Sequence, residues 1–264
     1  MSTATLQSSL HRTTSTGLIG EQPGPLRDIY WRYFSVHDAA APELRKQVHE
    51  LRYQVYCVEN PFEDRALHAN GLEIDHYDAH AIHALLIHRS TGLAAGTVRI
   101  VLPVAEQPEA SFAIQALCDK ALLGGHGQVP LATTGEISRF CITKTFRRRV
   151  QDRSYRTVPS NTEISAADER RVIPNMTLGL IAWLVEASQA RGITHWYAVM
   201  EPQLLRLLSR LGIHFDRIGD LVDYHGWRQP CVIAVDEMLA RVHRERPDIW
   251  SVIAHPVPVT PQAG

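Results

Sequence analysis

The sequence predicts an α/β protein built on a single mixed, mostly antiparallel sheet with helices on both faces. Two apolar runs, Ala81–His88 and Ala94–Leu102, are joined by a short turn and are typical of an antiparallel hairpin. Farther along the chain, amphipathic helical patterns alternate with strand-like runs. A chain of 264 residues is long enough to bury one core, so we expect one domain over residues 26–250.

The N-terminal elements are predicted from composition and spacing. Residues 1–25 are polar and are expected to be a flexible segment. The aromatic run Ile29–Val36 is interpreted as the first strand. Pro42 begins a helix, because the next apolar residues recur at spacings of three and four; these are Leu44, Val48, Leu51 and Val55.

The stretch Thr134–Ile142 is predicted to be the central strand, and it carries unusual charges for a strand. Glu136, Ser138 and Arg139 lie within four residues of one another. A buried charge needs a partner or a function, so a structural Glu136–Arg139 pair is one interpretation. Residues three apart on a regular strand point to opposite faces, which argues against that pair unless Gly135 kinks the chain.

The hairpin also carries a charge that requires a partner. Arg99 lies within its second strand between Val98 and Ile100, and Asp75 and Asp78 are the nearest acidic candidates. His76 and His80 have a helical metal spacing, but the surrounding residues do not favour a helix, so no metal site is expected. A short helix is expected near residues 111–122.

The C-terminal half alternates helices and strands. Asn175 is expected to cap a helix that ends at Ala190, and Ile193–Met200 is the next strand. A helix begins at Glu201-Pro202 and ends at Gly212. The last strand is expected at Cys231–Val235, followed by a short amphipathic helix and a tail over residues 251–264.

Charge and cysteine content limit the function classes. The formal net charge is −1, which gives no overall attraction to nucleic acid or to an anionic membrane. The four cysteines form no C-x-x-C pair, no signal peptide is recognised and no apolar run reaches transmembrane length. We therefore expect a cytoplasmic protein. The linker 147–172 is locally basic, because it holds seven arginines and four acids, a surplus of three positive charges.

Four motifs in this order resemble those of the acyl-homoserine lactone synthases and N-acyl amino acid synthases: Arg52-x-x-x-Tyr56, Glu73-x-Asp75-x-x-Asp78, Arg99, and Glu136-x-x-Arg139. The wider text is most similar to a branch of acyltransferases associated with PEP-CTERM/exosortase systems. This resemblance covers about residues 30–240 and implies the GCN5-related N-acyltransferase (GNAT) fold. There are two departures: Phe62 stands where the lactone synthases usually have tryptophan, and the segment from Arg170 lacks the glycine turn that binds the pyrophosphate of CoA.

The resemblance implies a transferase that moves a fatty acyl group from a carrier thioester to an amine, with Glu136 as the base. Arg52, Asp75, Asp78, Arg99, Ser138 and Arg139 would order or bind the substrate. Arg52 or Arg99 could bind a substrate carboxylate, and a purely structural role for these charged residues is an equal alternative. Acyl carrier protein is the expected donor and partner, with acyl-CoA less favoured and no cofactor bound permanently. The expected carrier-docking residues are Lys144, Arg147, Arg148 and Arg149, with a solvated charge run as the alternative.

Three other functions remain open from the sequence. The first is an acyl-homoserine lactone synthase that uses S-adenosylmethionine. The second is a small-molecule N-acetyltransferase that uses acetyl-CoA, which the missing glycine turn disfavours. The third is a non-catalytic domain that binds acyl chains or a carrier protein.

Overall fold

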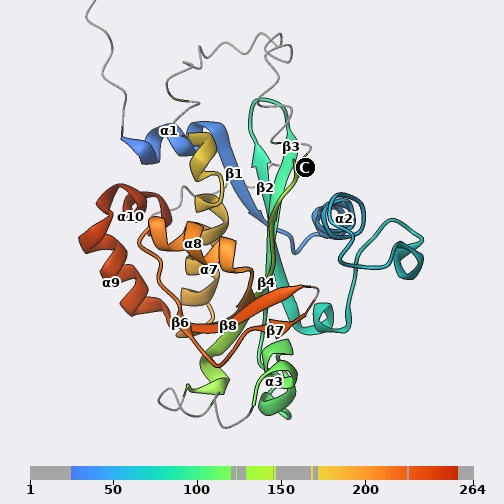
Figure 1. The fold of residues 1–264 in the computed structure, drawn as a ribbon. Helices are drawn as coiled ribbons and strands as arrows, with labels where there is room; N and C mark the ends of the chain where they lie inside the picture. The colour runs from blue at the N-terminus through green and yellow to red at the C-terminus, as the bar shows by residue number, and fades with distance from the viewer. Residues whose placement is uncertain are drawn as a thin grey trace, which may run out of the picture.

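The computed structural model describes residues 25–119, 123, 129–144, 146, 168, 172–224 and 226–254. Its centre is an eight-stranded sheet in the order β1-β2-β3-β4-β5-β8-β6, with β7 paired to β8 (Figure 1). Its neighbouring strands run antiparallel except for β4 and β5, which are parallel. The strands are β1 Phe34–Asp38, β2 Ala81–His88, β3 Leu93–Val101, β4 Thr134–Ile142, β5 His195–Met200, β6 Asp216–Arg217, β7 Val222–Asp223 and β8 Trp227–Ala234.

Helices cover both faces of the sheet, as predicted. The main core lies between one face and α1, α7, α8, α9 and α10. The other face packs against α2 and α3, and Figure 1 shows α2 on the side opposite α7 and α9. The α-helices are α1 Leu26–Tyr33, α2 Pro42–Tyr53, α3 Ala113–Leu117, α7 Leu178–Gln189, α8 Pro202–Arg210, α9 Val235–Glu245 and α10 Pro247–Ile253.

Short helical turns connect these elements. A π-helical turn, η1, extends α2 over Gln54–Glu59. The 3₁₀ turns are η2 Arg65–His68, η3 His76–His80, η4 Pro108–Ala110, η5 Leu131–Thr133 and η7 Ile173–Asn175. No helix among the described ranges is long and apolar enough to cross a membrane.

The expectation of a strand over Ile29–Val36 is wrong for its first half. Residues 26–33 form α1, and the strand begins only at Phe34. Leu26, Ile29, Tyr30 and Tyr33 are buried at helical spacings of three, one and three. This helical spacing outweighs the β preference of aromatic residues because it places all four side chains in the main core.

The start of one helix and the presence of one helical turn differ from the sequence prediction. Asn175 belongs to the turn η7, and α7 begins at Leu178. The start of α7 is fixed from outside by Tyr30, whose hydroxyl donates to the Met176 carbonyl and accepts the N–H of Gly179, both at 2.7 Å. Residues 76–80, for which no helix was expected, form η3 because the Asp75 carboxylate accepts the N–H of Tyr77.

The order of the other predicted helices and strands is confirmed, but β6, β7 and α10 were not predicted, and α10 reaches Ile253, within the tail expected over residues 251–264. The resulting sheet has an opening. The ladder between β4 and β5 pairs Thr134–Ile137 with His195–Ala198 and then stops. Both strands continue, β4 to Ile142 and β5 to Met200. Their C-terminal halves no longer pair with each other and therefore diverge. The candidate site lies at this opening.

Candidate active site

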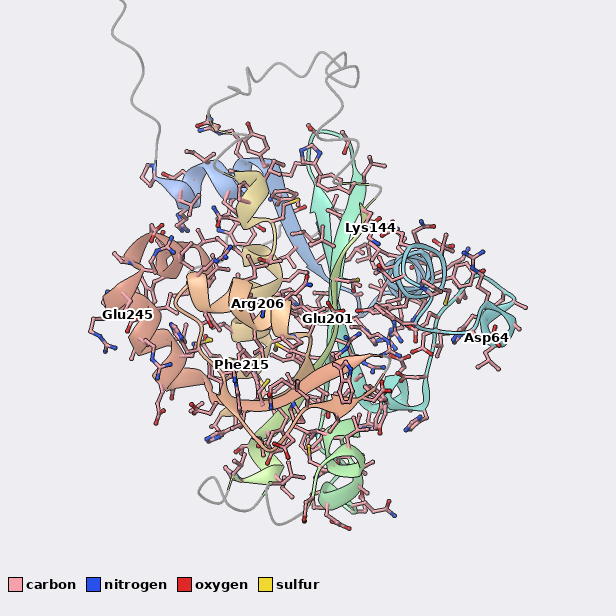
Figure 2. All side chains as sticks on the ribbon, in the orientation of Figure 1. Asp64, Lys144, Glu201, Arg206, Phe215 and Glu245 are labelled. Atoms are coloured by element: carbon pink, nitrogen blue, oxygen red, sulfur yellow. The ribbon has the colours of Figure 1, made fainter. Side chains whose placement is uncertain are left out.

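A pocket of about 450 Å³ lies at the opening between β4 and β5. Its apolar half consists of residues packed into the main core, namely Ile137, Phe140, Ile142, Met200 and Leu204. Its polar half faces α2 and α3 and includes Tyr56, Phe62, Glu63, Arg99, Glu136, Ser138, Arg139, Tyr224 and Arg228. Figure 2 shows Glu201, another lining residue, near the middle of the molecule and Lys144 farther along β4, close to α2.

Glu136 is the buried carboxylate at the base of this pocket. It is only 3% exposed, and one carboxylate oxygen accepts the N–H of Ile114 at 2.8 Å. Burial raises the pKa of Glu136 to about 7, against the smaller lowering effects of that hydrogen bond and of Arg99 and Arg139. A carboxyl group with this pKa can accept and release a proton near neutral pH.

A β-bulge next to Glu136 changes the direction of the side chains on β4. Thr97 faces Cys141 and Arg99 faces Ser138, so two residues of β4, Arg139 and Phe140, lie opposite Val98 alone. Arg139 has a φ of 50°, which is rare for a residue other than glycine. The bulge turns the Arg139 side chain to the α2 face, where its guanidinium lies 5.3 Å from the Tyr56 ring centroid.

Seven charged residues form what we call the ionic cluster: Arg52, Arg99, Arg139, Glu63, Glu73, Asp75 and Asp78. Arg52 is fully buried and binds Glu73 through Nε and both oxygens of Asp78 through Nη1 and Nη2, at 2.7 and 3.1 Å for the latter pair. This two-pronged contact is the geometry that a guanidinium makes best with a carboxylate. Arg52 therefore joins α2 to the segment that carries Glu73 and Asp78.

The other two arginines connect β3 and β4 to the same acids. Arg99 binds Asp75 at 2.6 Å and Asp78 at 2.8 Å, and its Nε donates to the Ser138 hydroxyl at 2.9 Å. Arg139 contacts three acids with Nη2: Glu73 at 2.9 Å, Asp75 at 3.0 Å and Glu63 at 3.2 Å. Arg139 is thus paired within the cluster rather than with Glu136.

Glu73, Asp75 and Asp78 are ionised, because their pKa values are lowered, and a neighbouring histidine is neutral. Burial acts to raise the pKa of Glu73, but Arg52 and Arg139 outweigh it and lower the value to about 2. The pKa of Asp78 is also lowered, because Arg52 and Arg99 outweigh burial. His83, 1% exposed, lies 3.6 Å from Asp78, yet burial and then Arg52 lower its pKa to about 3.

These protonation states leave the ionic cluster with more negative than positive charge. Three arginines face four acids, so three minus four gives a net charge of −1. His83 is neutral at pH 7 and does not compensate. Only Glu63, Arg99 and Arg139 of the cluster line the pocket, so its surplus acids are not pocket residues, and Glu136 is the buried carboxylate that a bound amine would meet there.

The structure brings together six of the sequence-predicted residues: Arg52, Asp75, Asp78, Arg99, Ser138 and Arg139. Arg52 directs Nε, Nη1 and Nη2 at Glu73 and Asp78, and Arg99 directs Nη1 at Asp75 and Asp78 and Nε at Ser138, so a substrate carboxylate bound by these donors would displace one of those partners. Lys144 is exposed and its Nζ contacts the Glu59 carbonyl at 3.2 Å and Asn60 at 2.5 Å. Arg147, Arg148 and Arg149 lie outside the described residues.

Several residues of the pocket and of the ionic cluster were not predicted as site residues. Glu73 is the most deeply buried acid of the cluster, and its place in the acidic motif could have identified it. Glu63, Tyr224, Glu201 and Arg228 come from four different loops or strands, and no local spacing connects them. Among the described residues, no group of three or more His, Cys, Asp or Glu side chains could hold a metal ion.

Comparison with known proteins identifies the fold. Residues 51–154 match the family model described as an acetyltransferase (GNAT) domain. A search of curated protein sequences found no match. Solved structures similar to this chain include TofI in a ternary complex with an inhibitor and MTA, with 20% identity and a TM-score of 0.53, covering 80% of this chain and 96% of TofI.

Two further structures have the same architecture. The AHL synthase LasI is 19% identical with a TM-score of 0.50, covering 77% of this chain and 90% of LasI. The CoA-dependent acyl-homoserine lactone synthase BjaI, solved with MTA, is 17% identical with a TM-score of 0.51, covering 85% of this chain and 90% of BjaI. At these identities the likeness concerns the fold, and the chain folds as a GCN5-related N-acyltransferase.

Proposed function

We propose that this protein is an N-acyltransferase that moves a fatty acyl group from an acyl-carrier-protein thioester to the amine of a small molecule, preferably an amino acid. The observation that carries this proposal is Glu136: a buried carboxyl with a pKa of about 7, placed where the polar and apolar halves of the pocket meet. The match of residues 51–154 to an acetyltransferase domain supports the same reaction class.

The polar half supplies the chemistry that an amine acceptor needs. An aliphatic amine is mostly protonated at neutral pH and cannot attack until it loses a proton. Glu136, directly or through one water, takes this proton, and the free amine nitrogen then forms a bond to the thioester carbonyl carbon. The C–S bond breaks as the tetrahedral intermediate collapses, and the second proton that the nitrogen loses on becoming an amide passes to the pantetheine sulfur, which leaves as a thiol.

The bulge on β4 supplies the group that stabilises the oxyanion. A bulge removes a backbone N–H from the regular ladder, and such a donor aimed at a developing oxyanion is worth about 3–4 kcal/mol. Arg139 and Phe140 form this bulge beside Glu136. The apolar half, with Phe140, Met200 and Leu204, is a suitable environment for the acyl chain and the pantetheine arm.

The donor is proposed to be carrier protein rather than CoA. Carrier proteins are acidic, and Lys144 with Arg147, Arg148 and Arg149 would offer them a basic docking surface where β4 ends. The segment before α7 also lacks the glycine turn that cradles the pyrophosphate of CoA. Membership of the PEP-CTERM/exosortase-associated branch is a further proposal that rests on the resemblance in sequence.

A lactone synthase is the second candidate, because structures similar to this one include acyl-homoserine lactone synthases. That reaction would use S-adenosylmethionine and release a lactone and methylthioadenosine. A domain that only binds acyl chains or a carrier is the non-enzymatic alternative. Neither alternative would yield an N-acyl amino acid as its product.

The test is product identification by mass spectrometry. Purified protein is incubated with decanoyl carrier protein or decanoyl-CoA, and with a mixture of the twenty amino acids or S-adenosylmethionine. An N-decanoyl amino acid is the expected product, formed faster from the carrier-bound donor. A lactone with methylthioadenosine would favour the second candidate, and a bound but unreacted donor in every mixture would favour the binding domain.

A further inference from the structure

Arg228 is the pocket arginine that stands outside the ionic cluster. It lies on β8, and its side chain is only 14% exposed. Its guanidinium carbon lies 5.1 Å from the centroid of the Phe62 ring, which holds the planar group in place. Both Arg228 and Phe62 line the pocket on the face that Glu136 occupies.

The partners of Arg228 leave part of its guanidinium available. Nη2 contacts a carboxylate oxygen of Glu201 at 3.2 Å, and Nη1 makes a long 3.4 Å contact with the neighbouring Trp227 carbonyl. Glu201 is 45% exposed, whereas Arg228 is largely buried. An exposed carboxylate is well solvated and holds its partner weakly, so a second anion can share or replace this contact.

The other cations of the pocket are occupied. Arg99 and Arg139 are surrounded by the surplus acids of the ionic cluster. Lys144 is exposed and holds Asn60 and the Glu59 carbonyl. The pocket therefore holds the buried carboxylate of Glu136 on β4 and, on β8, a stacked guanidinium whose remaining donors have no partner within the part of the chain that the structure describes.

We propose that Arg228 binds the carboxylate of the acceptor, whose ammonium faces Glu136, so that the acceptor is an amino acid in its zwitterionic form. This inference rests on the proposed N-acyltransferase function and names the residue that selects the acceptor. The ammonium and the carboxylate of one small molecule then match Glu136 and Arg228, respectively. An amine without a carboxylate would meet Glu136 alone.

The experiment measures product binding, which does not depend on turnover. Binding of N-decanoylglycine and of its primary amide is measured by isothermal titration calorimetry for wild type and for Arg228→Gln. Wild type is expected to prefer the acid about tenfold or more, as a charge-assisted hydrogen bond predicts. Arg228→Gln should lose this preference, mainly through weaker binding of the acid, and Arg228→Lys should retain part of it.

Two further variants separate recognition from a structural role. Glu201→Gln removes the competing carboxylate and should strengthen binding of the acid but not of the amide. Arg206→Gln makes the same change at an exposed arginine of α8 outside the pocket lining, labelled in Figure 2, and should leave both affinities unchanged. Thermal melting checks that each variant is folded.

Equal binding of acid and amide by wild type, or an undiminished preference in Arg228→Gln, overturns the inference. These outcomes are distinct from failure of the proposed function. A wild-type enzyme that acylates amino acid amides as fast as amino acids remains an N-acyltransferase, but Arg228 then does not select its acceptor.

Discussion

Glu136 and the acids of the ionic cluster are all buried, yet their protonation differs because different groups face them. Glu73 contacts two guanidinium groups directly, which lower its pKa to about 2. Glu136 receives one backbone N–H, and the nearby arginines are paired with other acids. Desolvation therefore controls Glu136, whereas ion pairing controls Glu73.

The first prediction concerns the pH dependence of acyl transfer. Wild-type kcat/KM should fall as the pH drops below about 7, because Glu136 becomes protonated and cannot accept the proton of the amine. Glu136→Gln should lower kcat by about 10²–10⁴ and remove this limb. Rates are measured from pH 5.5 to 9 with carrier-bound donor, and Glu186→Gln on the exposed side of α7 is the control. Wild-type turnover in Glu136→Gln would show that another group is the base.

The second prediction concerns Arg99. Arg99→Ala leaves Asp75 and Asp78 with fewer positive partners in a buried site, so it should cost about 3–5 kcal/mol of stability. At about 2–4 °C per kcal/mol for a chain of this size, Tm should fall by about 6–20 °C. Lys46→Ala, which removes an exposed pair with Glu50, is the control and should cost under about 0.5 kcal/mol. Equal melting of the two variants would contradict a buried role for Arg99.

At the residue scale, the sequence shows charges that need partners but not all of the partners. Arg52, Arg99 and Arg139 could be predicted as site residues because each lies in a helix or strand with apolar neighbours. The alternation of strand residues placed Arg139 on the face away from Glu136, and the bulge reverses this. Arg228 could not be found, because its importance depends on Phe62, more than 160 residues away in sequence, and on Glu201.

At the element scale, the helix α7 depends on a residue that no local pattern connects to it. Tyr30 of α1 binds the Met176 carbonyl and the Gly179 N–H at the start of α7. A Cβ at position 179 would lie 2.7 Å from the Tyr30 hydroxyl oxygen, so the helix needs glycine there. The sequence predicted the body of α7 from its apolar residues, but its first residue is decided by this tertiary contact.

The third prediction compares two buried tyrosines. Tyr30→Phe removes both hydrogen bonds and leaves a buried N–H and a buried carbonyl without this partner, which should cost about 1–3 kcal/mol. Tyr197 is also buried, but its hydroxyl has no hydrogen-bond partner among the described residues. Tyr197→Phe should therefore be neutral or stabilising. Urea denaturation of the two variants gives the comparison, and equal losses of stability would contradict it.

At the scale of the whole molecule, the sheet separates two chemical environments that meet at the opening between β4 and β5. The apolar side continues the main core, and the polar side carries the ionic cluster. The order of strands and helices could be predicted from periodicity, and the resemblance of four motifs implied the fold. The approach of β8 and of the loop carrying Phe62 to the same pocket follows only from tertiary packing.

Buried groups with shifted pKa values also determine how the stability of the whole molecule depends on pH. Glu136 has a raised pKa, so between about pH 4.5 and 7 the folded protein holds a proton that the unfolded chain has released. This lowers the free energy of unfolding as pH rises. His83 acts in the opposite direction: between about pH 3 and 6.5 the unfolded chain holds a proton that the folded protein excludes. This lowers the free energy of unfolding as pH falls.

The last prediction adds the differences in bound protons between the folded protein and the unfolded chain. Between pH 4.5 and 6.5 the contributions of Glu136 and His83 oppose each other, and His37, His49 and His88, whose pKa values burial also lowers, act in the same direction as His83. Wild-type stability should therefore fall as the pH drops through this window.

Below pH 4.5 Glu73, with its pKa lowered to about 2, also excludes a proton. His83 and Glu73 contribute about 2.7 kcal/mol per pH unit to this loss of stability, and Asp75 and Asp78, whose pKa values are also lowered, add to it. Glu136→Gln removes the contribution of Glu136, which opposes that of His83 between pH 4.5 and 6.5.

Between pH 4.5 and 6.5 the stability of Glu136→Gln should therefore rise with pH more steeply than that of wild type, by about 1.4 kcal/mol per pH unit. Urea denaturation at half-unit steps of pH measures both profiles, and Glu186→Gln again provides the control for loss of a carboxylate at the surface. Parallel profiles for wild type and Glu136→Gln would mean that Glu136 is already ionised in the folded protein between pH 4.5 and 6.5. This result would contradict the assignment of Glu136 as a base whose pKa is raised by burial.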